Sequence, residues 1–407
     1  MQLRALELDE FRSFRSLRLD IDPAGFRAIG ANASGKSTLL EAIAMLATTR
    51  SPRTSAEREL ANWESGSAYG LTPYARLRGV FDRIDGRHTI AIGLSVDEGG
   101  RTGLKKSVQF DDQPTRAIDA VGQFKTVLFS PDDVELVPGA PGGRRRYLDL
   151  VISQARKPYL RGLSRYVRVL EQRNGLLRSL SREGGAAAAH RASHELPFWD
   201  EELTSAAAIV LAERLAYVAR LGDAARVHFE QLTGVPSLEL IYQPHRLPGV
   251  ELPGASVLGK DDAMLQLQQR LAAQFSRAVG QVRPEEIRRG VTAVGPHRDD
   301  LAFRLEGADL GRFGSRGQQR LALVATKLAE VDLLRDVAGE PPVLLLDDVL
   351  SELDPRHRRL VVEMIATRPA QVCVTATDIH DLEATGLSHL PVLRVAAGRI
   401  ESDDEQR

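Results

Sequence analysis

Apolar and polar residues alternate along the first third of the chain. The alternation runs over 2–21 and again over 76–96, the second time across an Asp85-Gly86 pair. Strict alternation is typical of half-buried strands, and Asp-Gly favours a tight hairpin turn. A glycine-rich link, 97–103, then leads to one more short apolar run. The pattern therefore predicts antiparallel hairpins in the N-terminal part of the protein.

The middle of the chain has helical spacing instead. Apolar residues recur every three to four positions over 144–168 and from Trp199 to Leu232, on either side of the low-complexity stretch 181–195. Two long helices around a flexible turn form an antiparallel hairpin, which we expect over 144–232.

Two further helices are expected before the chain returns to sheet at Val291. One is capped by Asp261 and runs to Val279, and the other runs from Pro284 to Gly290. The segment after them, 295–300, contains His297 and two aspartates. A metal site is one interpretation of this segment, but one histidine in a turn is weak support, and a polar turn is the simpler reading.

Residues 30–38 read Gly-Ala-Asn-Ala-Ser-Gly-Lys-Ser-Thr between an apolar run and a helical one. This is the phosphate-loop pattern G-x-x-x-x-G-K-[ST], whose backbone N–H groups and helix N-terminus bind a polyphosphate. Lys36 is expected to reach the β- and γ-phosphates, and Ser37 to complete the shell of a Mg²⁺ ion. A glycine turn without a ligand is the alternative. The expected ATP-binding residues are Gly30, Ala31, Asn32, Ala33, Ser34, Gly35, Lys36, Ser37 and Thr38.

A second candidate for this site lies near the other end of the chain. The apolar run Val343 to Leu346 ends in Asp347-Asp348, which predicts a buried parallel strand with acids at its carboxyl end, where α/β sheets bind ligands. Asp347 is expected to hold Mg²⁺ through water, and Asp348 to orient or deprotonate the attacking water as a catalytic residue. A pair of helix-capping acids is the alternative. If both motifs form one site, the two chain ends must assemble together.

Charge is balanced overall, at a net −1, so any affinity for nucleic acid must come from local patches. The segment 144–168 is strongly basic, because it contains eight basic residues and a single acid, Asp149. Such a run is usually a solvated helix face, and contact with nucleic-acid phosphates is the other interpretation. The candidate DNA-binding residues are Arg144, Arg145, Arg146, Arg156, Lys157, Arg161 and Arg165.

Cysteine usage and hydropathy favour a soluble protein. The single cysteine, Cys373, allows no disulfide framework or cysteine metal cluster. No apolar run approaches the length of a membrane span, and charges at Arg4, Glu7 and Asp9 do not fit a signal peptide. We therefore expect a cytoplasmic protein without a membrane partner.

Several motifs are spread over nearly the whole chain: FRSF (11–14), GANASGKST (30–38), LLEAI (39–43), SPDD and GAPGGRRRYLD (within 130–149), GPHRDDL (295–301), GSRGQQR (314–320), TKLAE (326–330) and LLLDDVLSELD (344–354). Together they resemble the RecF family of bacterial recombination and gap-repair proteins. The resemblance implies an α/β fold, an ABC-type phosphate-loop ATPase head built from both chain ends with an inserted helical arm domain. The expected domains are an ATPase lobe over 1–135, the arm over 136–290 and a second lobe over 291–407.

The same resemblance implies activity and partners. The signature motif is Ser315, Arg316, Gly317, Gln318 and Gln319, which would act across an ATP-dependent homodimer, and Ser351 to Asp354 would form the loop after the acidic strand. The protein would bind single-stranded and duplex DNA at gap junctions, associate with the nucleoid, and work with a RecR-like mediator to help load RecA. Weak DNA-dependent ATP hydrolysis is expected.

Three positions differ from the RecF family or from ABC ATPases in general. Ala33 replaces the second glycine of the family's phosphate loop. Thr377 stands where many ABC ATPases carry the switch histidine, which RecF proteins generally lack too, so slow hydrolysis is expected. No clear Q-loop glutamine is found, and Gln123 is the candidate. Two other ATPase classes share the loop and signature. A membrane-transporter subunit would lack a basic arm, and a chromosome-tethering ATPase would need arms far longer than about 60 Å, the length of about 40 helical residues.

Overall fold

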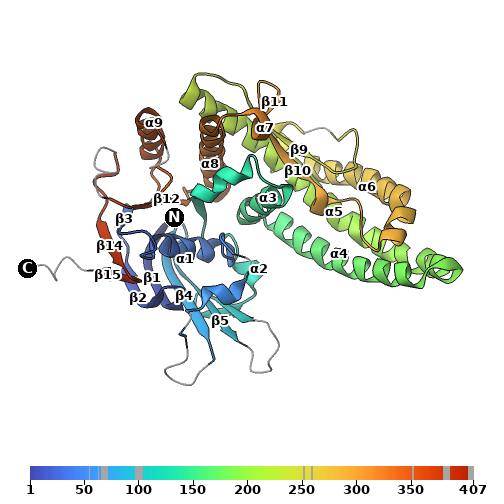
Figure 1. Ribbon diagram of the computed structural model, residues 1–407, viewed down its shortest axis with the longest axis horizontal. Helices are drawn as coiled ribbons and strands as arrows, with labels where there is room; N and C mark the ends of the chain where they lie inside the picture. Colours follow the sequence, from blue (N-terminus) through green and yellow to red (C-terminus); the bar gives the residue numbers. More distant parts are fainter. Residues whose placement is uncertain are drawn as a thin grey trace, which may run out of the picture. The chain divides into compact units, whose positions relative to one another are not determined.

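The computed structural model describes residues 1–54, 56–62, 64–65, 72–96, 104–250, 253–257, 260–350, 353–378 and 386–401. The link 97–103 and two residues of the predicted loop, Ser351 and Glu352, lie outside these ranges. The chain forms two compact units, one from Met1–Val134 with Glu330–Arg407 and the other from Glu135–Ala329. Both chain ends thus contribute to the first unit, as the blue and red segments in Figure 1 show.

An antiparallel sheet in the first unit contains the predicted hairpins. Its strand order is β2-β1-β4-β5-β6-β7, in which β1 (Gln2–Phe11) pairs with β2 (Phe14–Asp20), and β4 (Tyr74–Arg83) with β5 (Gly86–Val96). β6 (Leu104–Phe110) and β7 (Gln113–Thr115) extend it. The alternating segments therefore form hairpins as predicted.

The second sheet of this unit interleaves strands from both chain ends. Its order is β15-β14-β3-β13-β12-β8, with β15 (Arg399–Glu401) as the antiparallel edge. The parallel strands are β14 (Val392–Ala396), β3 (Gly25–Ile29), β13 (Val372–Ala376), β12 (Val343–Asp347) and β8 (Thr126–Phe129). Because β3 pairs with β13 and β8 with β12, the head cannot form from one chain end alone. The predicted buried parallel strand before Asp347 is confirmed.

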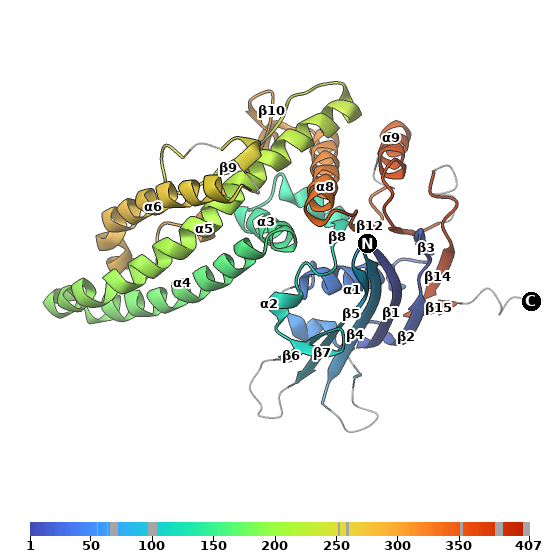
Figure 2. The same cartoon turned by 180° about the vertical axis from the view of Figure 1, so that it is seen from behind.

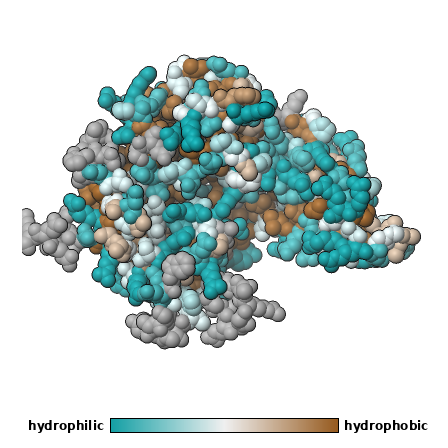
Figure 3. Space-filling model, viewed as in Figure 1, coloured by the Kyte–Doolittle hydropathy of each residue, from teal (hydrophilic) through white to brown (hydrophobic). Residues whose placement is uncertain are grey.

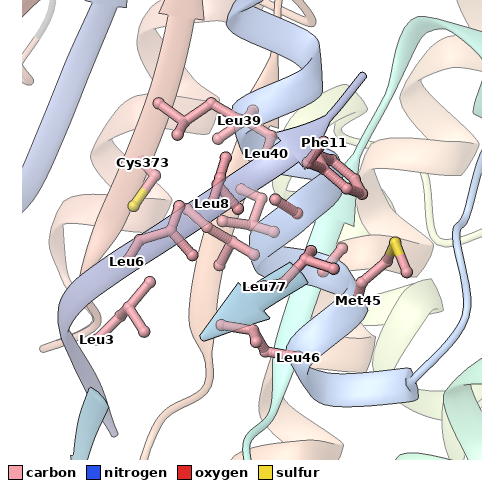
Figure 4. Packing of buried hydrophobic residues seen from close by; sticks show 14 of the residues in the cluster. Leu3, Leu6, Leu8, Phe11, Leu39, Leu40, Met45, Leu46, Leu77 and Cys373 are labelled. Atoms are coloured by element: carbon pink, nitrogen blue, oxygen red, sulfur yellow. The ribbon is translucent and has the colours of Figure 1, made fainter. Parts of the chain in front are cut away.

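Helix α1 (Lys36–Thr48) packs between the two sheets of the first unit. Its Leu39, Leu40 and Leu46 are fully buried with Leu6 of β1 and with Cys373 of β13, as Figure 4 shows. Burial also raises the pKa of the Cys373 thiol. Smaller elements of the unit are η1 (Glu57–Leu60), α2 (Ala117–Ala120), η3 (Pro131–Leu136) and α9 (Pro355–Ala366).

Long helices dominate the second unit, as Figure 2 shows. They are α3 (Pro141–Ala155), α4 (Lys157–Glu183), α5 (Gly185–Thr233) and α6 (Asp261–Arg289). A small antiparallel sheet has the order β11-β10-β9 and consists of β9 (Leu238–Gln243), β10 (Asp300–Leu305) and β11 (Ala308–Asp309). Short elements are η4 (Ala255–Val257), η5 (Pro296–Arg298) and α7 (Leu310–Phe313), and α8 (Arg316–Ala338) crosses the division between the units.

The hairpin of α4 and α5 differs from the prediction at its turn. The stretch 181–195 is helical except at Gly184, and both Gly184 (φ 63°) and Gly185 (φ 65°) have positive φ angles. Alanine has the highest helix propensity, and Ala188 and Ala192 are buried against Leu177 of α4. The expected flexible turn is therefore a pair of glycines, and the rest of the low-complexity segment belongs to α4 and α5.

Two other helix boundaries were predicted wrongly. Residues 144–168 belong to two helices instead of one. Pro158 lies in the first turn of α4, and Arg156 separates α4 from α3. Conversely, α6 is continuous through Pro284, and its N-cap is Lys260 rather than Asp261. Pro284 has no N–H group, so the Gly280 carbonyl lacks its usual hydrogen bond within the helix. Gly280 is exposed, so water can reach this carbonyl instead.

Residues 291–329 belong to the second unit, although the sequence analysis assigned them to the C-terminal lobe. The physical reason is strand pairing: β10 pairs with β9 along its full length, from Asp300 opposite Gln243 to Leu305 opposite Leu238. The division on that side of the chain therefore lies after Ala329, whereas the first division lies after Val134.

Candidate nucleotide site

Residues 30–35 connect the end of β3 to the start of α1, which is the strand-to-helix setting that a phosphate loop requires. Two residues of the loop have left-handed backbones, Ala33 with φ 62° and Gly35 with φ 116°. A Cβ atom at Gly30 would lie 2.1 Å from the Val395 carbonyl oxygen, so that position accepts only glycine. The left-handed backbones of Ala33 and Gly35 and the close approach at Gly30 together explain why the loop is tight.

Lys36 lies folded over the loop. Its Nζ donates hydrogen bonds to the carbonyl oxygens of Gly30 (2.6 Å) and Ala31 (2.9 Å). Burial lowers the pKa of the Lys36 ammonium, and the nearby charges of Asp348 and Asp347 oppose that effect. A cation is thus held beside the loop amides, where phosphate oxygens would bind.

The two motifs from opposite chain ends meet at Ser37 and Asp347. The Ser37 hydroxyl donates a hydrogen bond to Oδ1 of Asp347 at 2.8 Å. Thr375 donates to the same oxygen, also at 2.8 Å. Asp348 follows with φ 50°, another left-handed residue. The hydroxyl and the carboxylate that sequence analysis assigned to Mg²⁺ therefore lie within hydrogen-bonding distance.

A cavity of about 990 Å³ opens at this point, within the size range of small-molecule sites. The loop from Asn32 to Thr38, both aspartates and Thr375 line part of it. Sequence analysis missed the remaining lining residues or left their roles open: Arg12, Ser13, Arg53, Thr54, Glu59, Asn62 and Asp132. All of them belong to the first unit.

Arg12 is held in the cavity wall by hydrogen bonds at its side chain and its backbone. Its guanidinium forms two hydrogen bonds with the buried carboxylate of Glu41, at 2.9 and 2.8 Å. Ser51 donates to the same carboxylate at 2.5 Å, and the Arg12 carbonyl accepts from Asn62 at 2.6 Å. The FRSF and LLEAI motifs, which contain Arg12 and Glu41, were the signals from which this contact could have been found.

The residues present fit a nucleotide with Mg²⁺. Ser34 Oγ is buried in the loop and has no hydrogen-bond partner among the described atoms, as expected of a hydroxyl that serves a ligand. Ser37 and Asp347 offer the hydroxyl and carboxylate oxygens that Mg²⁺ prefers. When bound there, the ion would neutralise charge on the phosphates.

The structure divides the candidate DNA-binding residues. Arg144 is buried in a two-bond ion pair with Asp300 (2.7 and 2.8 Å), and Arg156 is paired with Glu213 (3.0 and 3.1 Å). These two are corrections to the list of candidates, because their guanidinium groups are engaged inside the protein. Arg145 donates to the Asp299 carbonyl, and Arg165 pairs with Glu202. The exposed candidates are Arg146, Lys157, Arg161 and Arg165.

The signature residues form the N-terminal turn of α8. The Ser315 N–H donates to the Gln318 side chain (2.9 Å), and the Gln318 N–H donates to the Ser315 hydroxyl (3.2 Å). This reciprocal pair is a capping box, which fixes the start of the helix. Gln319 is buried and donates to the Leu310 carbonyl, while Ser315, Arg316, Gly317 and Gln318 are exposed.

Two weaker candidates have structural partners instead. His297 lies 2.6 Å from the Tyr166 hydroxyl through Nδ1, and burial lowers its pKa to about 4. Across the described ranges, no group of three or more His, Cys, Asp or Glu side chains forms a metal site. Gln123 accepts a hydrogen bond from Arg83 and donates to the Asp119 carbonyl, and the described cavity lining does not include it.

Comparison with known proteins identifies the family. A family model described as RecF/RecN/SMC N terminal domain matches residues 2–390. The DNA replication and repair protein RecF of Thermomicrobium roseum is 45% identical and covers 98% of this chain and 100% of its own length. The protein of the same name from Chloroflexus aurantiacus is 41% identical, with coverage of 98% and 99%.

Solved structures agree with this. A structure of the recombination mediator protein RecF with ATP, in the RecFOR pathway, matches with a TM-score of 0.81 at 27% identity, covering 98% of this chain and 97% of that chain. The expected ABC-type ATPase head with an inserted helical arm is thereby confirmed. Within the described residues, no helix is both long and apolar enough to cross a membrane. The chain belongs to the RecF family.

Proposed function

We propose that this protein is an ATP-dependent DNA-binding protein of recombinational repair and replication restart, acting in the RecFOR pathway. The observation that carries the proposal is the 2.8 Å hydrogen bond between Ser37 and Asp347. It joins the phosphate loop to the acidic strand in one cavity, which is the arrangement that ATP with Mg²⁺ requires. Its relatives are DNA replication and repair proteins, and a solved relative contains ATP.

ATP binding is the main role in this proposal, and hydrolysis is slow. Thr377 follows β13 at the position where many ABC ATPases have the switch histidine. A threonine is not a general base near neutral pH, so the site lacks that proton acceptor. Asp347 and Asp348 remain the proposed catalytic carboxylates.

ATP assembles a homodimer in this proposal. The signature turn exposes Ser315 and Gly317 at the N-terminus of α8, a 23-residue helix. Its backbone N–H groups and hydroxyl suit the phosphates of a nucleotide bound by a second copy of the chain. Each ATP would then lie between the loop of one protomer and the signature of its partner.

DNA contact is assigned to an exposed face of α4. At 100° per residue, six exposed basic residues fall within one sector of this helix, and Lys157 to Arg182 spans about 38 Å. In Figure 3 the edge of the second unit formed by α4 is covered mainly by hydrophilic residues. Phosphate contacts of this kind bind DNA with little sequence preference. The six residues are Lys157, Arg161, Arg165, Arg168, Arg178 and Arg182.

The family also supplies the proposed partners and compartment. By its membership in the RecF family, the protein would bind single-stranded and duplex DNA at gap junctions in the cytoplasm, near the nucleoid. A RecR-like mediator would join it there, and RecA loading would follow indirectly. No membrane partner is part of the proposal.

One experiment tests the core of this function. Binding to a gapped DNA duplex and the mass of the protein in solution are measured with and without ATP-Mg²⁺. We expect ATP to produce a dimer and to strengthen DNA binding, and Lys36→Ala to abolish both changes. A mass and a DNA affinity that saturating ATP leaves unchanged would contradict the proposal.

A further inference from the structure

Thr375 lies at the carboxyl end of β13, directly opposite Asp347 in the register of the parallel sheet. Its residue surface is only 2% exposed, and yet it lines the nucleotide cavity. Neither its sequence context nor any family motif singled it out. A buried hydroxyl at this place must satisfy its hydrogen bonds locally, so its partners indicate what it does.

The Thr375 hydroxyl bridges the two adjacent aspartates. Oγ1 donates to Oδ1 of Asp347 at 2.8 Å and accepts from the N–H of Asp348 at 3.0 Å. One hydroxyl can make both bonds at once, because it has one proton and two lone pairs. Ser37 donates to the same Asp347 oxygen, so two hydroxyls from different elements fix this carboxylate.

The backbone of Asp348 also needs support. Its φ of 50° is left-handed, a region that disfavours residues with a side chain. Such strain persists where surrounding contacts hold it, and it is common at functional sites. The bond from the Asp348 N–H to Thr375 is a contact of that kind.

We propose that Thr375 is a positioning residue of the nucleotide site: its hydroxyl holds the Asp347 carboxylate beside Ser37 and fixes the left-handed backbone of Asp348. Thr375 acts through the two aspartates. The inference rests on the proposed function, since the placement of these acids matters to a ligand only if ATP and Mg²⁺ bind here. A purely structural hydroxyl, which would serve only the packing of β13 against β12, is the competing explanation.

Two substitutions at this position separate these explanations. Thr375→Val keeps the β-branched shape that suits a strand but removes the hydroxyl, and Thr375→Ser keeps the hydroxyl. Thr326→Val is the matched control, because Thr326 is also buried and its hydroxyl donates within α8, to the Ala322 carbonyl at 2.7 Å. Affinity for a fluorescent ATP analogue is titrated in EDTA and in Mg²⁺, and the melting temperature of each ligand-free protein is recorded.

We expect Mg²⁺ to strengthen nucleotide binding in the wild type, in Thr375→Ser and in Thr326→Val. In Thr375→Val the gain from Mg²⁺ should fall about tenfold, the scale of one lost bond to a charged group. Its affinity in EDTA should stay within about twofold of the wild type.

Two results would overturn the inference. If Thr375→Val keeps the full gain from Mg²⁺, or loses affinity equally in EDTA and Mg²⁺ in step with its melting temperature, the hydroxyl is structural. If the wild type itself binds no nucleotide, the proposed function fails and this inference fails with it.

Discussion

The Ser37 hydroxyl and the Asp347 carboxylate lie 2.8 Å apart, although 310 positions separate them in the sequence. The pairing of β3 with β13 and of β12 with both β13 and β8 brings them together. A site of this kind exists only when both chain ends are folded into one sheet. Nucleotide binding and the folding of the first unit are therefore linked, because a ligand that binds only the folded state stabilises it.

The strained phosphate loop gives the first prediction. Ala33 has φ 62°, and this left-handed backbone costs a residue with a Cβ about 1–2 kcal/mol. Glycine escapes that cost but loses more backbone entropy on folding, about 0.5–1 kcal/mol. Ala33→Gly should therefore stabilise the first unit by about 0.5–1 kcal/mol, measured as a higher melting temperature. It should also tighten ATP binding.

Ala31→Gly is the matched control for this prediction. Ala31 lies in the same loop, but its φ is not positive, so glycine there brings only the entropy cost. We expect it to lower the melting temperature. If both glycine variants lower the melting temperature, the left-handed backbone of Ala33 costs less free energy than the entropy that glycine loses on folding.

The parts of the site that sequence analysis found are those with a local signature. Residues 30–38 have a fixed motif spacing, with a strand pattern before them and a helix pattern after them. The apolar run Val343–Leu346 before Asp347 predicts a buried strand from the sequence alone. The sequence also shows that Ala33 replaces the glycine usual at this position. Only the backbone angle in the structure shows that this alanine is strained.

The parts that sequence analysis missed depend on tertiary contacts. Arg12 and Glu41 meet because β1 and α1 pack together, and Thr375 faces Asp347 because of strand register. Charge alone did not distinguish Arg144, which is buried against Asp300, from the exposed Arg161. Residues 181–195 were misjudged because an alanine-rich composition fits a linker and a tightly packed helix equally well.

The partly buried His297 predicts a loss of stability in mild acid. Its folded pKa is about 4, below an unfolded value of about 6.5, so only the unfolded chain binds this proton between those pH values. Stability should therefore fall as the pH drops from 6.5 towards 4, with about 2 kcal/mol lost at pH 5. Urea unfolding at pH 7 and pH 5 measures this. His297→Gln should remove this part of the pH dependence, whereas replacing the exposed His190 by Gln should leave it in place.

The buried ion pairs of Arg173 predict that a single substitution there strongly destabilises the second unit. This arginine is fully buried and donates to Glu286 (2.6 Å), Asp200 (2.8 Å) and Thr292 (2.8 Å). Arg173→Met would leave the buried Glu286 without its cation, at a cost of about 3–5 kcal/mol. Urea unfolding should show a large loss for this variant and little change for Arg178→Met, an exposed arginine of the same helix. Equal effects would mean that the buried ion pair is not essential.

The basic face of α4 predicts the salt dependence of DNA binding. Reversing Arg161 and Arg165 to Glu should weaken binding and reduce the slope of log affinity against log salt by about 0.9 for each lost phosphate contact. Reversing Arg270 and Arg277, exposed on α6, changes the net charge equally and serves as the control. If both pairs alter the slope alike, overall charge rather than the α4 face determines binding.

The last prediction concerns the proposed placement of ATP between two protomers. Lys36→Met removes the phosphate-loop cation, and Ser315→Arg puts a bulky cation into the exposed signature turn, so each variant alone should be inactive. When equal amounts are mixed, about half of the randomly formed dimers are heterodimers. Each heterodimer has one site with both defects and one site composed of two wild-type halves. Shared sites should therefore restore about a quarter of the ATP sites, whereas sites within single chains should restore none.

Trapping of labelled ATP should be measured together with turnover, because cooperativity between sites can hide recovery in turnover alone. Absence of recovery in both measurements would contradict the shared site.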